Sequence, residues 1–137
     1  MTERSVEVAV ALGTVPYEAR IVAREHRWSA DEPVEQGGGD GAPTPVEEAL
    51  GALGACTAIT VAMYARRKGW PLGGVSVAIV SSEDANRRRT IESRMRLAGD
   101  LTGEQRQRLL RIAEACPVHR MMSGGVVLET RLEEAAP

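Results

Sequence analysis

The residues best suited to chemistry in this chain are its only two cysteines, Cys56 and Cys116. Each lies in a segment with helical character, and the two are far apart in the sequence. A structural zinc site needs clustered ligands, such as a Cys-x-x-Cys pair or two histidines at helical spacing. His26 and His119, the only histidines, complete no such cluster. We therefore expect no metal site, and the separated thiols favour a redox interpretation.

A pair of thiols supports three interpretations. In peroxide reduction, one thiolate becomes a sulfenic acid and a second thiol condenses with it to form a disulfide. In a Cys-His protease, one cysteine is paired with a histidine and an orienting amide or carboxylate. Buried cysteines also serve as inert small hydrophobes. The residues alone leave all three interpretations open, although nothing in the sequence defines the protease geometry.

A peroxide-reducing thiol must be a thiolate near neutral pH. Cys56 lies about three turns into its predicted helix, too far from the N-terminus for the helix dipole to stabilise a thiolate strongly. A cation from elsewhere is therefore expected. Arg20, Arg24 and Arg27, in the early strands, are the candidates, because an arginine stays charged even when it is buried.

A buried arginine needs a carboxylate to orient its guanidinium group, and Glu47 and Glu48 are the candidates. At about 1.5 Å and 100° per residue, Glu48 lies about 12 Å along the helix axis from Cys56 and roughly 80° around it. Glu47 lies on the opposite face. Neither carboxylate can touch the thiol directly, so any catalytic role must act through an arginine. Otherwise both serve only the start of the helix.

The cysteine-bearing helix has clear sequence boundaries. A loop rich in glycine and proline, residues 36–45, precedes it. Thr44 is the predicted N-cap and Pro45 the first helical residue. Lys68 is the predicted end, because Gly69 and a proline follow. The interior is apolar on almost every side, which predicts a helix covered on both faces. Its small residues would let another helix approach closely, and we expect that helix to come from a second copy of the chain.

The other elements complete an α+β chain. A capping box at Thr102 and Gln105 starts a second helix, which Pro117 ends at or just before Cys116. Alternation of apolar residues predicts strands in the following segments: 6–11, 17–28, 75–80, 91–97 and 126–132. The order is strands, long helix, hairpin, helix and strand, which is α+β and not a parallel βαβ sheet.

Composition sets the class of protein. A length of 137 residues suits a single domain, 1–137, with frayed ends at 1–5 and 133–137. The net charge of −2 is that of an ordinary soluble chain and does not favour nucleic-acid binding. The longest apolar run is short for a membrane span and is interrupted by glycine and threonine. With no export signal, we expect a cytoplasmic protein that does not enter a membrane.

Three segments of the chain resemble the OsmC/Ohr family of organic hydroperoxide reductases. They are residues 45–57 (PVEEALGALGACT), 67–72 (RKGWPL) and 113–120 (AEACPVHR). The resemblance extends over roughly residues 17–132. It implies antiparallel sheets wrapped around two main helices in an intertwined homodimer, with the active sites at the dimer interface.

The resemblance also implies roles for the cysteines. Cys56 corresponds to the thiol that attacks the peroxide and Cys116 to the thiol that resolves the sulfenic acid. No cofactor is implied, and an external dithiol, lipoyl-type or another thiol, would reduce the disulfide. Val46 occupies the position at which typical members carry the glutamate that pairs with the catalytic arginine. Glu47 follows it, as in the Pro-x-Glu branch of the family.

The expected function is therefore reduction of organic hydroperoxides by Cys56 and Cys116, with Glu47 and Arg24 as the supporting pair. Arg20 and Arg27 are alternatives to Arg24. The substitution at Val46 keeps a second hypothesis open. In that hypothesis, the dimer senses oxidation or binds a small apolar ligand, with little turnover of peroxide.

Overall fold

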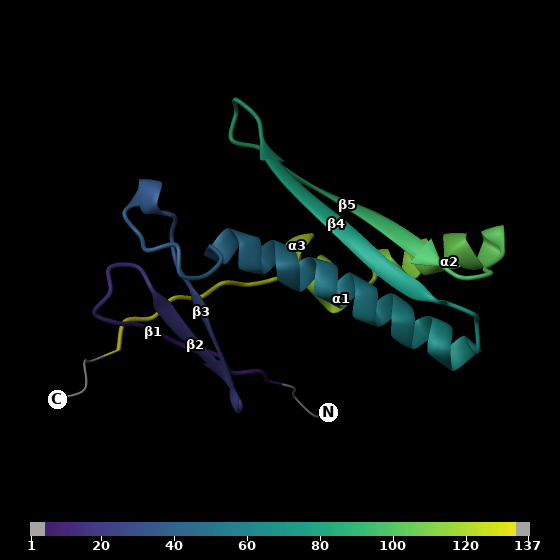
Figure 1. Cartoon of the computed structure of the whole chain (residues 1–137), viewed down its shortest axis with the longest axis horizontal. Coiled ribbons are helices and arrows are strands. Elements are labelled where there is room, and N and C mark those ends of the chain that lie inside the picture. Colours follow the sequence, from purple (N-terminus) through teal and green to yellow (C-terminus); the bar gives the residue numbers. More distant parts are fainter. Residues whose placement is uncertain (1–4, 134–137) are drawn as a thin grey trace. The chain divides into compact units, whose positions relative to one another are not determined.

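The computed structural model describes residues 5–133, and its contacts divide the chain into two compact units. The first unit is Met1–Gly51 and the second is Ala52–Pro137. Figure 1 shows the elements of both units coloured along the sequence. Most of the two tails expected to fray, residues 1–4 and 134–137, lies outside the described residues.

The first unit contains an antiparallel sheet of three strands in the order β1-β2-β3. The strands are β1 (Ala9–Leu12), β2 (Ala19–Ala23) and β3 (His26–Ala30). The predicted early strands are therefore confirmed, but the segment 17–28 contains a turn and two strands. Arg24, with a φ of +54°, lies in the tight connection that pairs Ala23 with His26. Its left-handed backbone reverses the chain between β2 and β3. The sequence did not predict this turn, because arginine is not a typical turn residue.

Asp31, directly after β3, organises the glycine-rich loop. Its carboxylate is almost fully buried and accepts hydrogen bonds from the backbone N–H groups of Gly41 (3.0 Å) and Glu32 (2.7 Å). These bonds, that of Gly41 first, hold the pKa of Asp31 below its ordinary value against the opposing effect of burial. A Cβ atom at Gly38 would collide with the Glu32 carbonyl. The loop, which includes the short helix η1 (Val34–Gln36), therefore requires both the carboxylate and the glycine.

Helix α1 (Pro45–Lys68) has the boundaries that the sequence predicts. Gly69 follows it with a φ of +70°, as expected for a residue that ends a helix. The expectation that both faces are covered is not met within this chain, because only one stripe is buried, and Ile59 and Met63 are more than half exposed. The buried stripe consists of Leu53, Thr57, Val61 and Ala65. Within the described residues, α1 is the one helix whose length and apolar composition would suit a membrane crossing.

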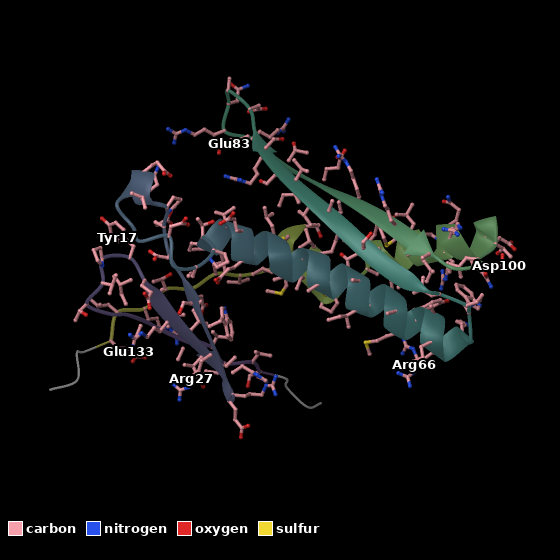
Figure 2. The ribbon with its side chains drawn as sticks, viewed as in Figure 1. Tyr17, Arg27, Arg66, Glu83, Asp100 and Glu133 are labelled. Carbon is pink, nitrogen blue, oxygen red and sulfur yellow. The ribbon has the colours of Figure 1, made fainter. Side chains whose placement is uncertain are left out.

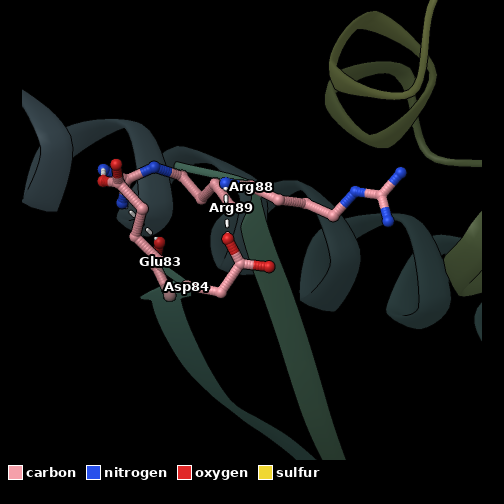
Figure 3. A network of polar contacts seen from close by, with 5 residues as sticks. Glu83, Asp84, Arg88 and Arg89 are labelled. Carbon is pink, nitrogen blue, oxygen red and sulfur yellow. Dashed lines mark hydrogen bonds and ion pairs between the residues drawn. The ribbon is translucent and has the colours of Figure 1, made fainter. Parts of the chain in front are cut away.

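The second unit contains a long antiparallel hairpin, β4 (Gly74–Glu83) and β5 (Arg89–Ala98), as predicted. Ile79 of β4 contacts α1, at 3.4 Å from the position that a Cβ atom would take at Gly54. At the tip, Asp84 accepts the Arg88 N–H at 3.0 Å and Arg89 pairs with Glu83 at 3.3 Å (Figure 3). Three consecutive arginines, residues 87–89, therefore belong to a hairpin tip that also carries the acidic residues Glu83 and Asp84.

Two helices follow the hairpin. Helix α2 (Gly103–Glu114) begins with the predicted capping box, in which Thr102 and Gln105 exchange side-chain to backbone hydrogen bonds. It ends two residues before Cys116, which instead serves as the N-cap of α3 (Pro117–Met122). The sequence did not predict α3, because a helix of six residues has too short an apolar pattern to detect.

The predicted strand at 126–132 is wrong for the chain described here, because this segment has no strand conformation. Val127 and Leu128 are 84% and 90% exposed. A strand requires a neighbour that shares its backbone hydrogen bonds, and alternation of side chains does not supply one. Within residues 5–133, the segment forms no ladder with either sheet.

The hydrophobic core lies in the second unit, between α1, α2 and the hairpin. Its buried members are Val61, Ala65, Leu101, Leu109 and Ala113. Trp70 packs against this core and meets the ring of Tyr64 edge to face, with ring centroids 5.6 Å apart. The core thus fixes α2 against the C-terminal half of α1, which begins directly after Cys56. In fold class the chain is α+β with antiparallel sheets.

Candidate active site

Cys56 lies in the middle of α1 and is partly exposed. Its Sγ atom is 4.0 Å from the Thr60 hydroxyl oxygen, one helical turn further along. No main-chain N–H of the helix is free at this depth, because each donates to the carbonyl four residues earlier. A thiolate at Cys56 would therefore depend on side chains for stabilisation, as the sequence indicates.

Cys116 lies in a different environment, with no exposed surface. It occupies the junction between α2 and α3, where its Sγ accepts the His119 backbone N–H at 3.4 Å. The same Sγ is 3.8 Å from the Thr57 hydroxyl oxygen. Cys116 is therefore held by one group from α3 and one from α1.

Thr57 connects the two cysteines, because it is next to Cys56 in α1 and contacts Cys116 from outside that helix. It follows Cys56 in the sequence, so their Cα atoms are about 3.8 Å apart, and its hydroxyl contacts the Cys116 thiol. Both cysteines are free thiols in this structure. The fold thus places the Cys116 sulfur against the helical turn that carries Cys56, although the residues are distant in the sequence.

A groove of about 680 Å³ lies within the second unit, and its lining includes Thr57 and His119, which contact the Cys116 sulfur. Leu53 and Thr57 of α1 form part of its wall, and Ile91, Met95 and Leu97 of β5 form another part. Further lining residues, from β5, α2, α3 and the C-cap of α3, are Arg89, Ser93, Arg106, Leu110, Ala113, Glu114, His119, Met122 and Ser123. Apolar and polar side chains therefore line the groove in equal number, and the polar ones include the charged Arg89, Arg106 and Glu114.

Glu47 belongs to the start of α1. Its carboxylate accepts the Thr44 backbone N–H at 2.9 Å, and its own N–H donates to the Thr44 hydroxyl at 3.1 Å. This is a reciprocal capping box, which satisfies two backbone donors at the helix end. The structure thus gives Glu47 a structural task, and its catalytic role stays a prediction.

The three candidate arginines are exposed in the first unit. Arg24 occupies the tight turn after β2, and Arg20 pairs with Glu18 at 3.9 Å. Arg27, on β3, extends from the sheet in Figure 2. Cys56 belongs to the other unit, so a contact between any of these arginines and the thiol stays a prediction.

Thr57 is the site residue that sequence reasoning missed. Its position in the sequence could have indicated it. Thr57 lies four residues after Leu53 and four before Val61, on the buried stripe of α1. A hydroxyl on such a stripe needs a buried partner. Among residues 5–133, no group of three His, Cys, Asp or Glu side chains could hold a metal ion.

The fold and the site together define a class: α+β proteins of antiparallel hairpins in which a long helix carries a thiol and a second thiol packs beside it. The OsmC-like protein family model matches residues 37–131. This match covers more than half of the chain, and the chain therefore belongs to the OsmC-like family. No sequence among curated proteins matches it.

Solved structures share the fold at low sequence identity. An OsmC-like protein from Mycoplasma pneumoniae has a TM-score of 0.77 at 14% identity, with 90% of this chain and 91% of that chain covered. An organic hydroperoxide resistance protein from Legionella pneumophila has a TM-score of 0.64 at 16% identity, with coverages of 90% and 93%. An OsmC-like protein of unknown function from Vibrio cholerae has a TM-score of 0.67 at 9% identity, with coverages of 87% and 94%. The fold therefore occurs both in hydroperoxide resistance proteins and in a protein without an assigned function.

Proposed function

We propose that this chain is a thiol-dependent peroxidase that reduces organic hydroperoxides. The observation that carries the proposal is the Cys116 sulfur, 3.8 Å from the hydroxyl of the residue next to Cys56, in a chain of the OsmC-like family. This contact supports the proposal, because it lies one residue from the position at which a sulfenic acid at Cys56 would form. The apolar residues in the lining of the groove, among them Leu53, Ile91 and Met95, suit an alkyl group on the peroxide.

The proposed reaction has two chemical steps. The Cys56 thiolate attacks the distal oxygen of the hydroperoxide, the O–O bond breaks, and the alkoxide leaves as an alcohol after taking a proton. The Cys116 thiolate then attacks the Cys56 sulfur, the S–O bond breaks, and hydroxide leaves as water after taking a proton. An external dithiol, lipoyl-type or other, returns the two electrons. Arg24 and Glu47 are the proposed supporting pair for the first step.

The test treats the reduced protein with a small excess of cumene hydroperoxide and titrates its free thiols. The proposal predicts rapid loss of both thiols in the wild type. In Cys116→Ser it predicts a trapped sulfenic acid at Cys56, and in Cys56→Ser it predicts an unreacted Cys116. Thiols that survive prolonged exposure in the wild type would leave the cysteines as inert core residues.

A second candidate function is sensing of oxidation, or binding of a small apolar ligand, with little turnover. Two observations favour it: Val46 stands where typical relatives carry a glutamate, and the Glu47 carboxylate is engaged in a capping box. Repeated cycles with excess cumene hydroperoxide and dihydrolipoamide separate the two functions. A peroxidase consumes the peroxide continuously, whereas a sensor stops after one equivalent.

We also propose that the chain is a cytoplasmic homodimer that binds no nucleic acid and enters no membrane. Exposed Ile59 and Met63 on α1, together with the exposed segment 126–132, offer apolar surface for a second copy. Light scattering during size-exclusion chromatography tests the dimer. A monomer at micromolar concentration would contradict it.

A further inference from the structure

The two thiols differ sharply in access and in hydrogen bonding. Cys56 is partly exposed, whereas Cys116 has no exposed surface and lies within reach of two hydrogen-bond donors. Exchange between a thiol and a disulfide depends on which sulfur the thiolate can reach and on how easily the other sulfur leaves as a thiolate. The Cys56 sulfur is the one that a reductant can reach, and the Cys116 sulfur is the one that hydrogen-bond donors would stabilise as a leaving thiolate.

The donors at Cys116 come from Thr57 and His119. The His119 backbone N–H donates to the Cys116 sulfur at 3.4 Å. The Thr57 hydroxyl lies 3.8 Å from the same sulfur and is only 4% exposed, so water cannot readily replace that contact. When Cys116 is a thiolate it can only accept, and the hydroxyl must then donate. Such a charge-assisted bond is stronger than the bond to a neutral thiol.

We propose that Thr57 is a positioning residue that sets the direction in which the disulfide is reduced. This inference rests on the proposed function, because it concerns the disulfide formed in that cycle. The reducing thiolate attacks the Cys56 sulfur, a new S–S bond joins the reductant to Cys56, and the Cys56–Cys116 bond breaks. The electron pair of the broken bond leaves with Cys116, as a thiolate held by Thr57 and His119.

The cycle then closes on Cys56. The second thiolate of the dithiol attacks the reductant's own sulfur in the mixed disulfide, which makes a cyclic disulfide and releases Cys56 as a thiolate. The dithiol loses two electrons and two protons, and the protein gains two thiols. Attack in the other direction would require the reductant to reach the Cys116 sulfur, which has no exposed surface in the folded chain.

Mapping the mixed disulfide tests the direction in the wild-type protein. Diamide, which oxidises thiols without a peroxide, forms the disulfide, and glutathione then opens it for a short time before an acid quench. N-ethylmaleimide labels the released thiol, and peptide mass spectrometry locates both adducts. We expect glutathione on Cys56 and maleimide on Cys116. Glutathione mainly on Cys116, or no Cys56–Cys116 bond after diamide, would overturn the inference.

The same experiment separates this inference from the proposed function. If diamide forms the disulfide but cumene hydroperoxide does not, the peroxidase fails and the direction of exchange is still measured. If the peroxide forms the disulfide but glutathione appears on Cys116, the peroxidase stands and the role of Thr57 fails.

Substitution at Thr57 tests the hydroxyl itself. In Thr57→Val, which keeps the shape and removes the donor, we expect reduction of the disulfide by dihydrolipoamide to slow about fivefold, as for loss of one hydrogen bond to a developing thiolate. Thr57→Ser should restore most of the rate. An unchanged rate in Thr57→Val, or equal slowing in both variants, would overturn the inference.

Val61→Ala is the matched control for stability. Val61 lies one turn beyond Thr57 on the same buried stripe and contributes to the core. We expect this variant to lower the denaturation midpoint and to leave the rate of reduction within twofold of the wild type. Slowing equal to that of Thr57→Val would show that destabilisation alone explains the effect.

Discussion

The adjacent leucines of α2 give a sharp test of the core. Leu109 has no exposed surface and belongs to the buried cluster of the second unit. Leu110 is 46% exposed and lines the groove. The two side chains are identical and consecutive, so replacing each by alanine changes helix propensity by nearly the same amount. Any difference in stability between the two variants therefore reports the difference in burial.

The expected magnitudes follow from burial. A buried leucine replaced by alanine loses its transfer free energy and leaves a cavity, at a cost of about 2–5 kcal/mol. Leu109 is fully enclosed, so we expect Leu109→Ala to lower the free energy of unfolding by about 3–4 kcal/mol. Leu110 keeps about half its surface in water, and we expect Leu110→Ala to cost under about 1 kcal/mol.

The assay is urea denaturation followed by circular dichroism at one fixed protein concentration, because a dimer would make stability depend on concentration. A loss of core packing should lower the midpoint for Leu109→Ala and leave the denaturant slope unchanged. Equal losses for the two variants would refute the assignment of Leu109 to the core. A larger loss for Leu110→Ala would show that the groove is filled by something that stabilises the fold.

Three further predictions concern local structure. The pKa of Asp31 is lowered in the folded protein. Its contribution to stability is therefore present above the pKa of the unfolded chain and is lost as the pH falls through the lower pKa of the folded chain. When the free energy of unfolding is measured from about pH 5 downward, it should fall less steeply in Asp31→Asn than in the wild type. Thr102→Ala removes the capping box of α2 and should cost about 1 kcal/mol in thermal or chemical denaturation, whereas Thr102→Ser should cost little; equal losses would contradict the cap. Gly38→Ala forces a Cβ atom against the Glu32 carbonyl and should lower the melting temperature, while Gly51→Ala, which meets nothing within 4 Å in this chain, should not.

Much of the architecture was predictable because its causes are local. The boundaries of α1 follow from Thr44, Pro45 and Gly69, which act on the first and last turns of that helix and need no distant partner. The capping box that starts α2 is equally local. The β4 and β5 hairpin follows from side-chain alternation across a short polar turn. The early sheet was predicted less well, because the positive φ of Arg24 has no typical sequence signal.

The candidate site was predictable only in part. The sequence supplied Cys56 and Cys116 as a thiol pair, because they are the only cysteines and lie in segments that resemble one family. It did not indicate that Cys116 caps α3, and it left open whether Glu47 serves the start of α1 or a catalytic arginine, since both depend on where individual hydrogen bonds form. The predicted strand at 126–132 failed because a ladder depends on a neighbouring strand, which alternation along one chain cannot specify.

The sequence by itself determined the two longer helices, the β4 and β5 hairpin, the α+β class and the identity of the two thiols, because caps, turns and periodicity act over a few residues. Only the tertiary structure decided what surrounds each thiol. Helices α1 and α2 share a core that includes Val61 and Leu109, and the Cys116 sulfur, just after α2, contacts Thr57 of α1 across 59 positions of the sequence. Such a contact follows from the shape of the whole core, and no local pattern encodes it.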